Sequence, residues 1–408
     1  MANQPQLFTI TTPPGAIERL RERLADPILP NQLEGVTWEY GTELATLKEY
    51  ISRWREFNWE KALDKINQFS HYKLEVNDID LHFIHEPPRK HPERAIPLLL
   101  IHGWPGTFWE FNKVIDPLVN PESDDLPVFD VIVPSLPGYG YSSPPMRPGF
   151  GIAAMAETLH TLMLKLGYEK YAVQGGDWGS IISRVISLKY PQHCKAMHLN
   201  GVYCFPPVGW NLWKTIKPAL WFAGLTSIYD KQSEKFIRDT YEFMKKETAY
   251  QQIQGTKPQS LAYGLTDSPV GLLAWLLEKY HTWTDTRGDP SKAFNVTDED
   301  FLTTVTIYYL TCTIASSMRI YYEFMQKPET VKLLRQYATV PTGCALFDGD
   351  IIKAPKEWAE HYLNVQDGAF NTYNKGGHFA ALEEPQILIN DIRKFFKKLK
   401  IFGHDARM

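Results

Sequence analysis

Residues 175–180 read Gly-Gly-Asp-Trp-Gly-Ser, the most informative motif of the chain. It follows a short apolar run at 171–173 and precedes an apolar, helix-like segment at 181–190. The spacing Gly175-x-Asp177-x-Gly179 predicts a sharp strand-to-helix turn, where only small residues avoid collisions beside the central one. A carboxylate presented at such a turn can displace a leaving group from saturated carbon and form an ester. A turn-forming or helix-capping aspartate is the alternative interpretation.

The composition describes a folded protein with no nucleic-acid-binding character. The chain has 408 residues, of which 44% are hydrophobic and 22% are charged, so it can build a large packed core. Its formal net charge is −4, and the basic residues near the C-terminus at 394–400 are interpreted as the solvated face and last turn of a helix. We therefore expect no nucleic-acid partner.

The sequence also favours a soluble, cytoplasmic protein. Its four cysteines are scattered without metal-ligand spacing, as is typical of reduced thiols. The N-terminus lacks the pattern of a signal peptide, and no apolar run reaches the ~18 residues expected of a membrane-spanning helix. The apolar stretch Pro218–Leu225 is interpreted as packing over a substrate tunnel in preference to contact with a bilayer.

Apolar runs alternate with helical patterns through the middle of the chain. The runs at 97–101, 129–133, 171–173 and 196–202 predict strands that are buried on both faces. The helical patterns between them predict a mainly parallel central sheet with helices on both faces. Together with the turn at Asp177, this α/β pattern resembles the α/β-hydrolase fold, in which such a turn carries the nucleophile.

Four segments are predicted. Residues 1–95 form an N-terminal extension that packs on the core, with a helix near 44–54 and a strand pair at 71–85 that turns at Asn77-Asp78. Residues 96–204 and 336–408 form the two halves of the α/β-hydrolase core. Residues 205–335 are rich in aromatic residues and helical patterns, and they are predicted to form a helical lid.

A second motif, His102-Gly103-Trp104-Pro105-Gly106, lies just beyond the strand predicted at 97–101. In α/β-hydrolases a loop at this place supplies one backbone N–H to an oxyanion hole, and the residue after the nucleophile supplies the other. The donors predicted here are the amides of Trp104 and Trp178. Pro105 has no N–H and can only stiffen the loop. An ordinary tight turn is the alternative. His102 is interpreted as a structural residue of the loop and His198 as a core residue.

A general base and its partner are predicted near the C-terminus. His378 follows a Gly-Gly pair, and Asp350 follows a short strand ending at Phe347. The order Asp177, Asp350, His378 matches the order of nucleophile, acid and histidine in this fold. An imidazole acts as general base when a carboxylate orients its other nitrogen. Asp348 remains an alternative for that carboxylate.

The chain as a whole resembles an epoxide hydrolase of the microsomal type, closest in layout to the soluble fungal members. The similarity runs from the aromatic N-terminal segment through both glycine-rich motifs to the sequence Gly-Gly-His-Phe-Ala-Ala-Leu-Glu-Glu-Pro at 376–385. The sequence shows no match to the transmembrane anchor of the vertebrate enzymes, so membrane association is not expected from the resemblance. The vertebrate relatives carry Glu as the orienting acid, whereas Asp350 is shorter by one methylene.

The resemblance implies two lid tyrosines that hold the epoxide oxygen. The first is placed by the triplet Thr256-Lys257-Pro258 at Tyr250. The second falls two residues after Arg319, at Tyr321, and its neighbour Tyr322 remains an alternative.

The expected activity is hydrolysis of small-molecule epoxides to vicinal diols through a covalent ester on Asp177, without a metal or organic cofactor. A haloalkane dehalogenase is one alternative, since Trp178 beside the nucleophile also suits halide binding. A non-catalytic ligand receptor with this fold is another. The lid tyrosines favour the epoxide. The preferred epoxide and the oligomeric state, a homodimer included, are left open by the sequence.

Overall fold

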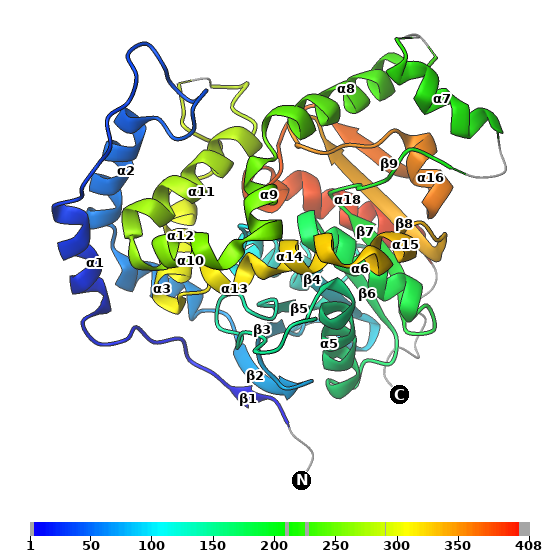
Figure 1. Cartoon of the computed structure of the whole chain (residues 1–408). Helices are drawn as coiled ribbons and strands as arrows, with labels where there is room; N and C mark the ends of the chain where they lie inside the picture. Colours follow the sequence, from blue (N-terminus) through cyan, green and yellow to red (C-terminus); the bar gives the residue numbers. More distant parts are fainter. Residues whose placement is uncertain (1–3, 209–211, 225–227, 290, 400–408) are drawn as a thin grey trace.

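The computed structural model describes residues 4–208, 212–224, 228–289 and 291–399. Within these ranges one sheet has the strand order β1-β2-β3-β5-β4-β6-β7-β8-β9 (Figure 1). Its strands are β1 (Gln6–Leu7), β2 (His71–Val76), β3 (Ile79–Glu86), β4 (Ile96–Ile101), β5 (Phe129–Pro134), β6 (Tyr171–Gly175), β7 (Cys194–Leu199), β8 (Ala338–Phe347) and β9 (Leu363–Tyr373).

The sheet is parallel from β5 to β9 and antiparallel from β1 to β5. Every residue of β4, β5 and β6 is buried, which explains their continuous apolar sequences. The predicted α/β-hydrolase fold with a mainly parallel sheet is confirmed. Parallel strands present their carboxyl ends at one edge, where ligands of α/β proteins bind.

The hairpin β2–β3 joins the sheet directly. Asn77 and Asp78 both have positive φ angles, 53° and 62°, as a two-residue hairpin turn requires. Strand β3 then pairs with β5, so part of the N-terminal segment extends the sheet in addition to packing on it. The strand predicted at 196–202 is displaced along the chain, because β7 spans Cys194–Leu199 and the chain leaves the sheet after Leu199.

The helices of the core flank the sheet, and those of the N-terminal segment pack beside the helices that lie between β7 and β8. They are α1 (Ala16–Ala25), α2 (Leu44–Glu56), α3 (Trp59–Ile66), α4 (Ile115–Val119), α5 (Ile152–Lys165), α6 (Asp177–Lys189), α16 (Lys356–Tyr362), α17 (Ala380–Glu383) and α18 (Pro385–Lys398), with short 3-10 turns at Pro92–Arg94 and Phe108–Phe111. Figure 1 shows α1 and α2 at the opposite side of the molecule from α7 and α16.

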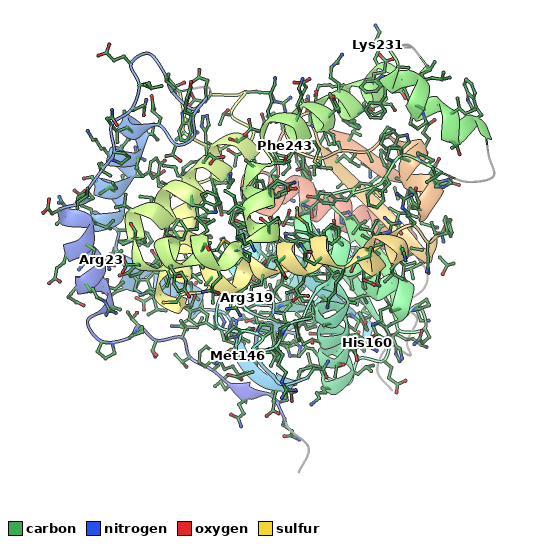
Figure 2. The ribbon with its side chains drawn as sticks, viewed as in Figure 1. Arg23, Met146, His160, Lys231, Phe243 and Arg319 are labelled. Atoms are coloured by element: carbon green, nitrogen blue, oxygen red, sulfur yellow. The ribbon has the colours of Figure 1, made fainter. Side chains whose placement is uncertain are left out.

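The chain between β7 and β8 is helical in its described parts. These helices are α7 (Leu212–Phe222), α8 (Lys231–Lys246), α9 (Ala249–Thr256), α10 (Pro258–Asp267), α11 (Pro269–Trp283), α12 (Asp298–Thr311), α13 (Ile314–Ser317), α14 (Arg319–Gln326) and α15 (Pro328–Leu334). Helix α8 begins at the periphery near Lys231 and reaches the body of the molecule at Phe243, which is buried (Figure 2). The domain boundaries at 95, 204 and 335 stay predictions.

The segment Pro218–Leu225 ends outside the described residues. In its described part Pro218 is buried and Phe222 is exposed on α7 while also lining a cavity. No single helix in the described ranges is long and apolar enough to cross a membrane. The pair Asp298–Thr311 and Ile314–Gln326 meets the length and composition test together, with a bend of 97° between its halves. All four cysteines are free thiols.

Candidate active site

The strand-to-helix turn after β6 places Asp177 at the first residue of α6. Its backbone φ angle is 48°, an unfavourable value for a residue other than glycine. The neighbouring glycines allow this geometry. A Cβ atom at Gly175 would collide with the backbone of Gly179, and one at Gly179 would collide with the carbonyl oxygen of Ile101. The predicted sharp turn is therefore present, and it depends on close contact between α6 and the end of β4.

The two carboxylate oxygens of Asp177 have different partners. Oδ1 accepts a hydrogen bond from the backbone N–H of Trp104 at 2.7 Å. Oδ2 lies 3.4 Å from Nε2 of His378 and accepts a hydrogen bond from the Tyr203 hydroxyl at 3.4 Å. The carboxylate thus faces the imidazole and is not turned into the protein interior.

His378 is held on both sides. Its Nδ1 lies 2.8 Å from Oδ1 of Asp350, and its backbone N–H donates to the carbonyl oxygen of Trp283 at 2.9 Å. Burial lowers the pKa of His378, but the Asp350 and Asp177 carboxylates outweigh burial and raise this pKa to about 10. The two neighbouring carboxylates therefore favour the imidazolium form of His378.

The structure distinguishes Asp350 from Asp348. Asp350 is 5% exposed and faces His378, and its Oδ1 also accepts the backbone N–H of Ile351 at 2.7 Å. Asp348 points elsewhere and forms ion pairs with Lys235 and Arg287. Of the two candidates, only Asp350 is in contact with the imidazole.

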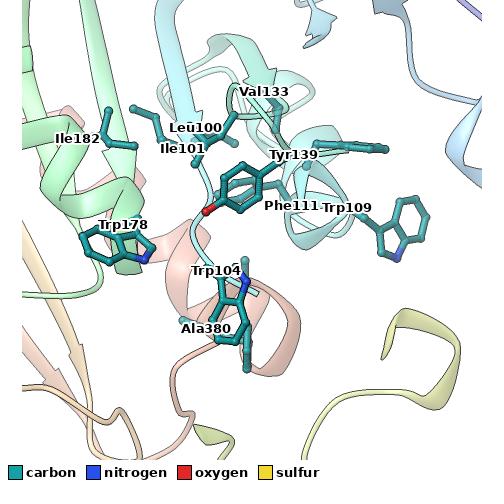
Figure 3. Packing of buried hydrophobic residues seen from close by; sticks show 14 of the residues in the cluster. Leu100, Ile101, Trp104, Trp109, Phe111, Val133, Tyr139, Trp178, Ile182 and Ala380 are labelled. Carbon is teal, nitrogen blue, oxygen red and sulfur yellow. The ribbon is translucent and has the colours of Figure 1, made fainter. Parts of the chain in front are cut away.

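The loop after β4 brings the Trp104 amide to the Asp177 carboxylate, as the motif predicts. The peptide bond between Trp104 and Pro105 is cis. The Trp178 amide belongs to the first turn of α6, where N–H groups have no acceptor within the helix. Within the described residues it makes no hydrogen bond to Asp177. Figure 3 shows Trp104 and Trp178 in the buried cluster around the end of β4.

His102 and His198 have structural surroundings. The backbone N–H of Leu136 donates to Nε2 of His102, so Nδ1 carries the proton and donates to the Gly103 carbonyl. Burial lowers the pKa of His102 to about 4, which keeps this ring neutral. His198 lies in β7 and is 2.9 Å from Asp391 in the core.

A cavity of about 410 Å³ opens in front of Asp177 and is lined by both predicted tyrosines. Tyr250 and Tyr321 are 5% and 3% exposed, and their rings lie 5.7 Å apart in an edge-to-face arrangement. Tyr322 is 41% exposed, so Tyr321 is the tyrosine that faces the cavity. Trp178, Phe324 and Trp358 contribute to its mostly apolar wall.

Three residues near the site were missed from the sequence. The Tyr203 hydroxyl contacts Asp177. Lys353 is a buried residue of the loop that carries Asp350. Glu110 is buried close to His378 and Asp177, and within the described residues its carboxylate has no hydrogen-bond partner. Tyr203 had a signal in the sequence, because it follows a strand that lies beside the nucleophile strand. A charged residue among apolar neighbours was the only signal for the other two.

In the described part of the chain, no three His, Cys, Asp or Glu side chains are grouped as ligands for a metal ion. The site is instead built from a carboxylate, an imidazole–carboxylate pair, a backbone amide and two phenols. These are the parts of a nucleophilic hydrolase.

The fold and this site define an α/β-hydrolase with an aspartate at the nucleophile turn, and a model of the alpha/beta hydrolase fold matches residues 96–301. A second family model, the epoxide hydrolase N terminus, matches residues 5–111. Epoxide hydrolase 1 of Sus scrofa is 35% identical over 96% of this chain and 88% of its own length. The chain belongs to the epoxide hydrolase family.

Two solved structures resemble the whole molecule. Juvenile hormone epoxide hydrolase from the silkworm Bombyx mori has a TM-score of 0.88 and 30% identity, covering 97% of this chain and 94% of its own. Aspergillus niger epoxide hydrolase has a TM-score of 0.83 and 28% identity, covering 97% of each chain. The protein is a hydrolase of this family. These similarities do not favour the alternatives of a haloalkane dehalogenase or a non-catalytic receptor.

Proposed function

We propose that the protein converts epoxides to vicinal diols in two steps, through an alkyl ester on Asp177. The observation that supports this most is the position of the Asp177 carboxylate. It lies between the His378 imidazole and a cavity lined by Tyr250 and Tyr321. A nucleophile, a base and two proton donors therefore meet at one place.

In the first step Asp177 attacks a ring carbon of the epoxide. Oδ1 is held by the Trp104 amide, so Oδ2 is the attacking oxygen. A bond forms between Oδ2 and the carbon, and the bond from that carbon to the epoxide oxygen breaks. Tyr250 and Tyr321 donate to this oxygen as negative charge develops on it. The product is a 2-hydroxyalkyl ester.

In the second step water attacks the carboxyl carbon of the ester. His378, oriented by Asp350, takes a proton from the water. The Trp104 and Trp178 amides stabilise the oxyanion, an effect of roughly 3 kcal/mol per donor in comparable sites. The bond between the carboxyl carbon and the alkyl oxygen then breaks, and the alkyl oxygen takes up the proton of the regenerated carboxyl group. The diol leaves with one former oxygen of Asp177, and His378 keeps the proton taken from water, as in the resting imidazolium.

Electrostatics link the two steps. The charged Asp177 helps to raise the pKa of His378, which favours the imidazolium before the reaction. Ester formation removes that negative charge, so the pKa of His378 falls and the ring can lose its proton, which restores the phenol that protonated the epoxide oxygen. The base therefore becomes available only after the ester has formed.

The test is to trap the ester. His378→Gln removes the base and leaves the nucleophile, so we expect styrene oxide to add its mass to the protein, as seen by intact-protein mass spectrometry. Asp177→Ala is the control and should show neither the adduct nor turnover. A His378→Gln protein that forms no adduct would contradict the two-step scheme.

Isotope labelling gives an independent check. A single turnover in water enriched in ¹⁸O should place the label in Asp177 and leave the diol unlabelled. Label found in the diol after one turnover would mean that water attacks the epoxide directly.

A further inference from the structure

Lys279 is a buried lysine in the lid whose ammonium group lies against one of the two proposed proton donors. It belongs to α11 and is 3% exposed. Its Nζ atom is 4.4 Å from the centre of the Tyr250 ring and forms an ion pair with Glu278 at 2.6 Å. Burial lowers the pKa of Lys279, and the Glu278 carboxylate opposes this effect.

The Tyr250 hydroxyl has a donor of its own. The side-chain amide of Gln251 donates to the Tyr250 oxygen at 3.0 Å. This hydrogen bond occupies a lone pair of the oxygen and leaves the O–H free to point into the cavity, which Gln251 also lines. A donor to the phenol oxygen stabilises the negative charge that appears there when the proton leaves.

Tyr321 has different surroundings. Its ring packs edge-on against Trp104 and Trp178, with centroids 5.6 and 4.8 Å away. Among the cation–π contacts between described residues, none involves Tyr321. The two tyrosines share a cavity but only one of them has a cation against its ring.

We propose that Lys279, assisted by Gln251, makes Tyr250 the principal proton donor to the epoxide oxygen, while Tyr321 mainly orients that oxygen. This inference rests on the proposed function. A cation over a phenol ring is attracted to its negative face, and the attraction increases as negative charge spreads into the ring during proton transfer. The contact therefore stabilises the transition state more than the resting enzyme, which is the condition for faster chemistry. Lys279 touches no reacting atom and acts as a positioning residue through Tyr250.

The experiment is a double-mutant cycle on the alkylation step. Single-turnover ester formation from styrene oxide is measured by rapid quench and mass spectrometry. Lys279→Met should slow this step about 10- to 30-fold and leave the rate of ester hydrolysis unchanged. The same substitution should have almost no effect in the Tyr250→Phe protein, and its full effect in the Tyr321→Phe protein.

Further variants separate charge from packing. Lys279→Arg keeps a cation at the ring and should stay close to the native rate, and Lys279→Gln replaces the Met variant if that protein does not fold. Lys246→Met is the matched control, because Lys246 is an exposed lysine of the lid helix α8. If Lys279→Met slowed ester formation equally in proteins with and without the Tyr250 hydroxyl, the inference would be overturned. If Tyr250→Phe alone left alkylation unchanged, the proposed role of Tyr250 itself would fall.

Discussion

Asp350 and Asp348 are separated by one glycine, yet their carboxylates have unrelated partners. Asp350 contacts the His378 imidazole, whereas Asp348 pairs with Lys235 and Arg287, which lie in the segment predicted as the lid. A carboxylate beside the imidazole stabilises the imidazolium that forms when water loses its proton. An ion pair of half-exposed side chains contributes little to either chemistry or stability.

Asp350→Asn should therefore slow hydrolysis of the ester on the order of 10³- to 10⁴-fold. The ester should accumulate on the protein during turnover of styrene oxide, as seen by mass spectrometry. Asp348→Asn is the matched control, and it should keep turnover within about threefold of native and lose less than about 1 kcal/mol of stability. Comparable losses in both variants would mean that the loop as a whole, and not the Asp350 carboxylate, supports the base.

At the scale of elements, α8 is joined to the loop that carries Asp350. The Thr240 hydroxyl accepts the backbone N–H of Lys353 at 2.9 Å and donates to its carbonyl oxygen at 3.0 Å. The buried Lys353 ammonium donates to the carbonyl oxygen of Asp350 at 2.6 Å and lies 3.5 Å from Asp239 of α8. These contacts thus connect one wall of the cavity to the loop whose Asp350 contacts His378.

Thr240→Val keeps the shape of the side chain but leaves the N–H and C=O of Lys353 unpaired, at a cost of about 1–3 kcal/mol. We expect faster amide hydrogen exchange in α8 and a larger change in KM than in kcat, because α8 lines the cavity. Thr256→Val, which removes a hydrogen bond within α9 only, is the control. Exchange in α8 that matched the native protein would show that this attachment does not hold the lid.

Parts of the fold and of the site could be predicted where a local sequence pattern encodes them. Parts that only tertiary contacts create could not be predicted. Strands β4 to β6 are buried on both faces, so their sequences are plainly apolar. Strand β9 was not predicted, because most of its residues are only partly buried and Gly368 interrupts it, and it forms by pairing with β8. Asp177 and Trp104 could be predicted because the glycines that their turns require are recognisable in the sequence. Lys279 and Tyr250 come together only when α9 packs beside α11, which no local pattern encodes.

Two glutamates, Glu110 near the site and Glu383 at the end of α17, link the stability of the whole molecule to pH. Burial raises the pKa of both Glu110 and Glu383 from 4.5 to about 8. Above pH 4.5 the unfolded chain loses these protons while the native state retains them. The contribution of these two groups to the stability of the protein is therefore greatest below about pH 4.5, and it is lost as the pH rises through 8. The pKa of His378, raised from 6.5 to about 10, extends the decline over that higher range.

Glu110→Gln should flatten this dependence, because an amide has no proton to retain. Each retained proton gives a slope of about 1.4 kcal/mol per pH unit, so the variant should lose about half of the decline between pH 4.5 and 8 that the two glutamates share. The measurement is the midpoint of urea unfolding at several pH values in that range. Glu122→Gln is the control, since Glu122 is an exposed carboxylate whose pKa is lowered by hydrogen bonds and by Arg393. If the midpoint of urea unfolding changed with pH equally in the native and Glu110→Gln proteins, the Glu110 carboxyl would not hold its proton in the folded molecule.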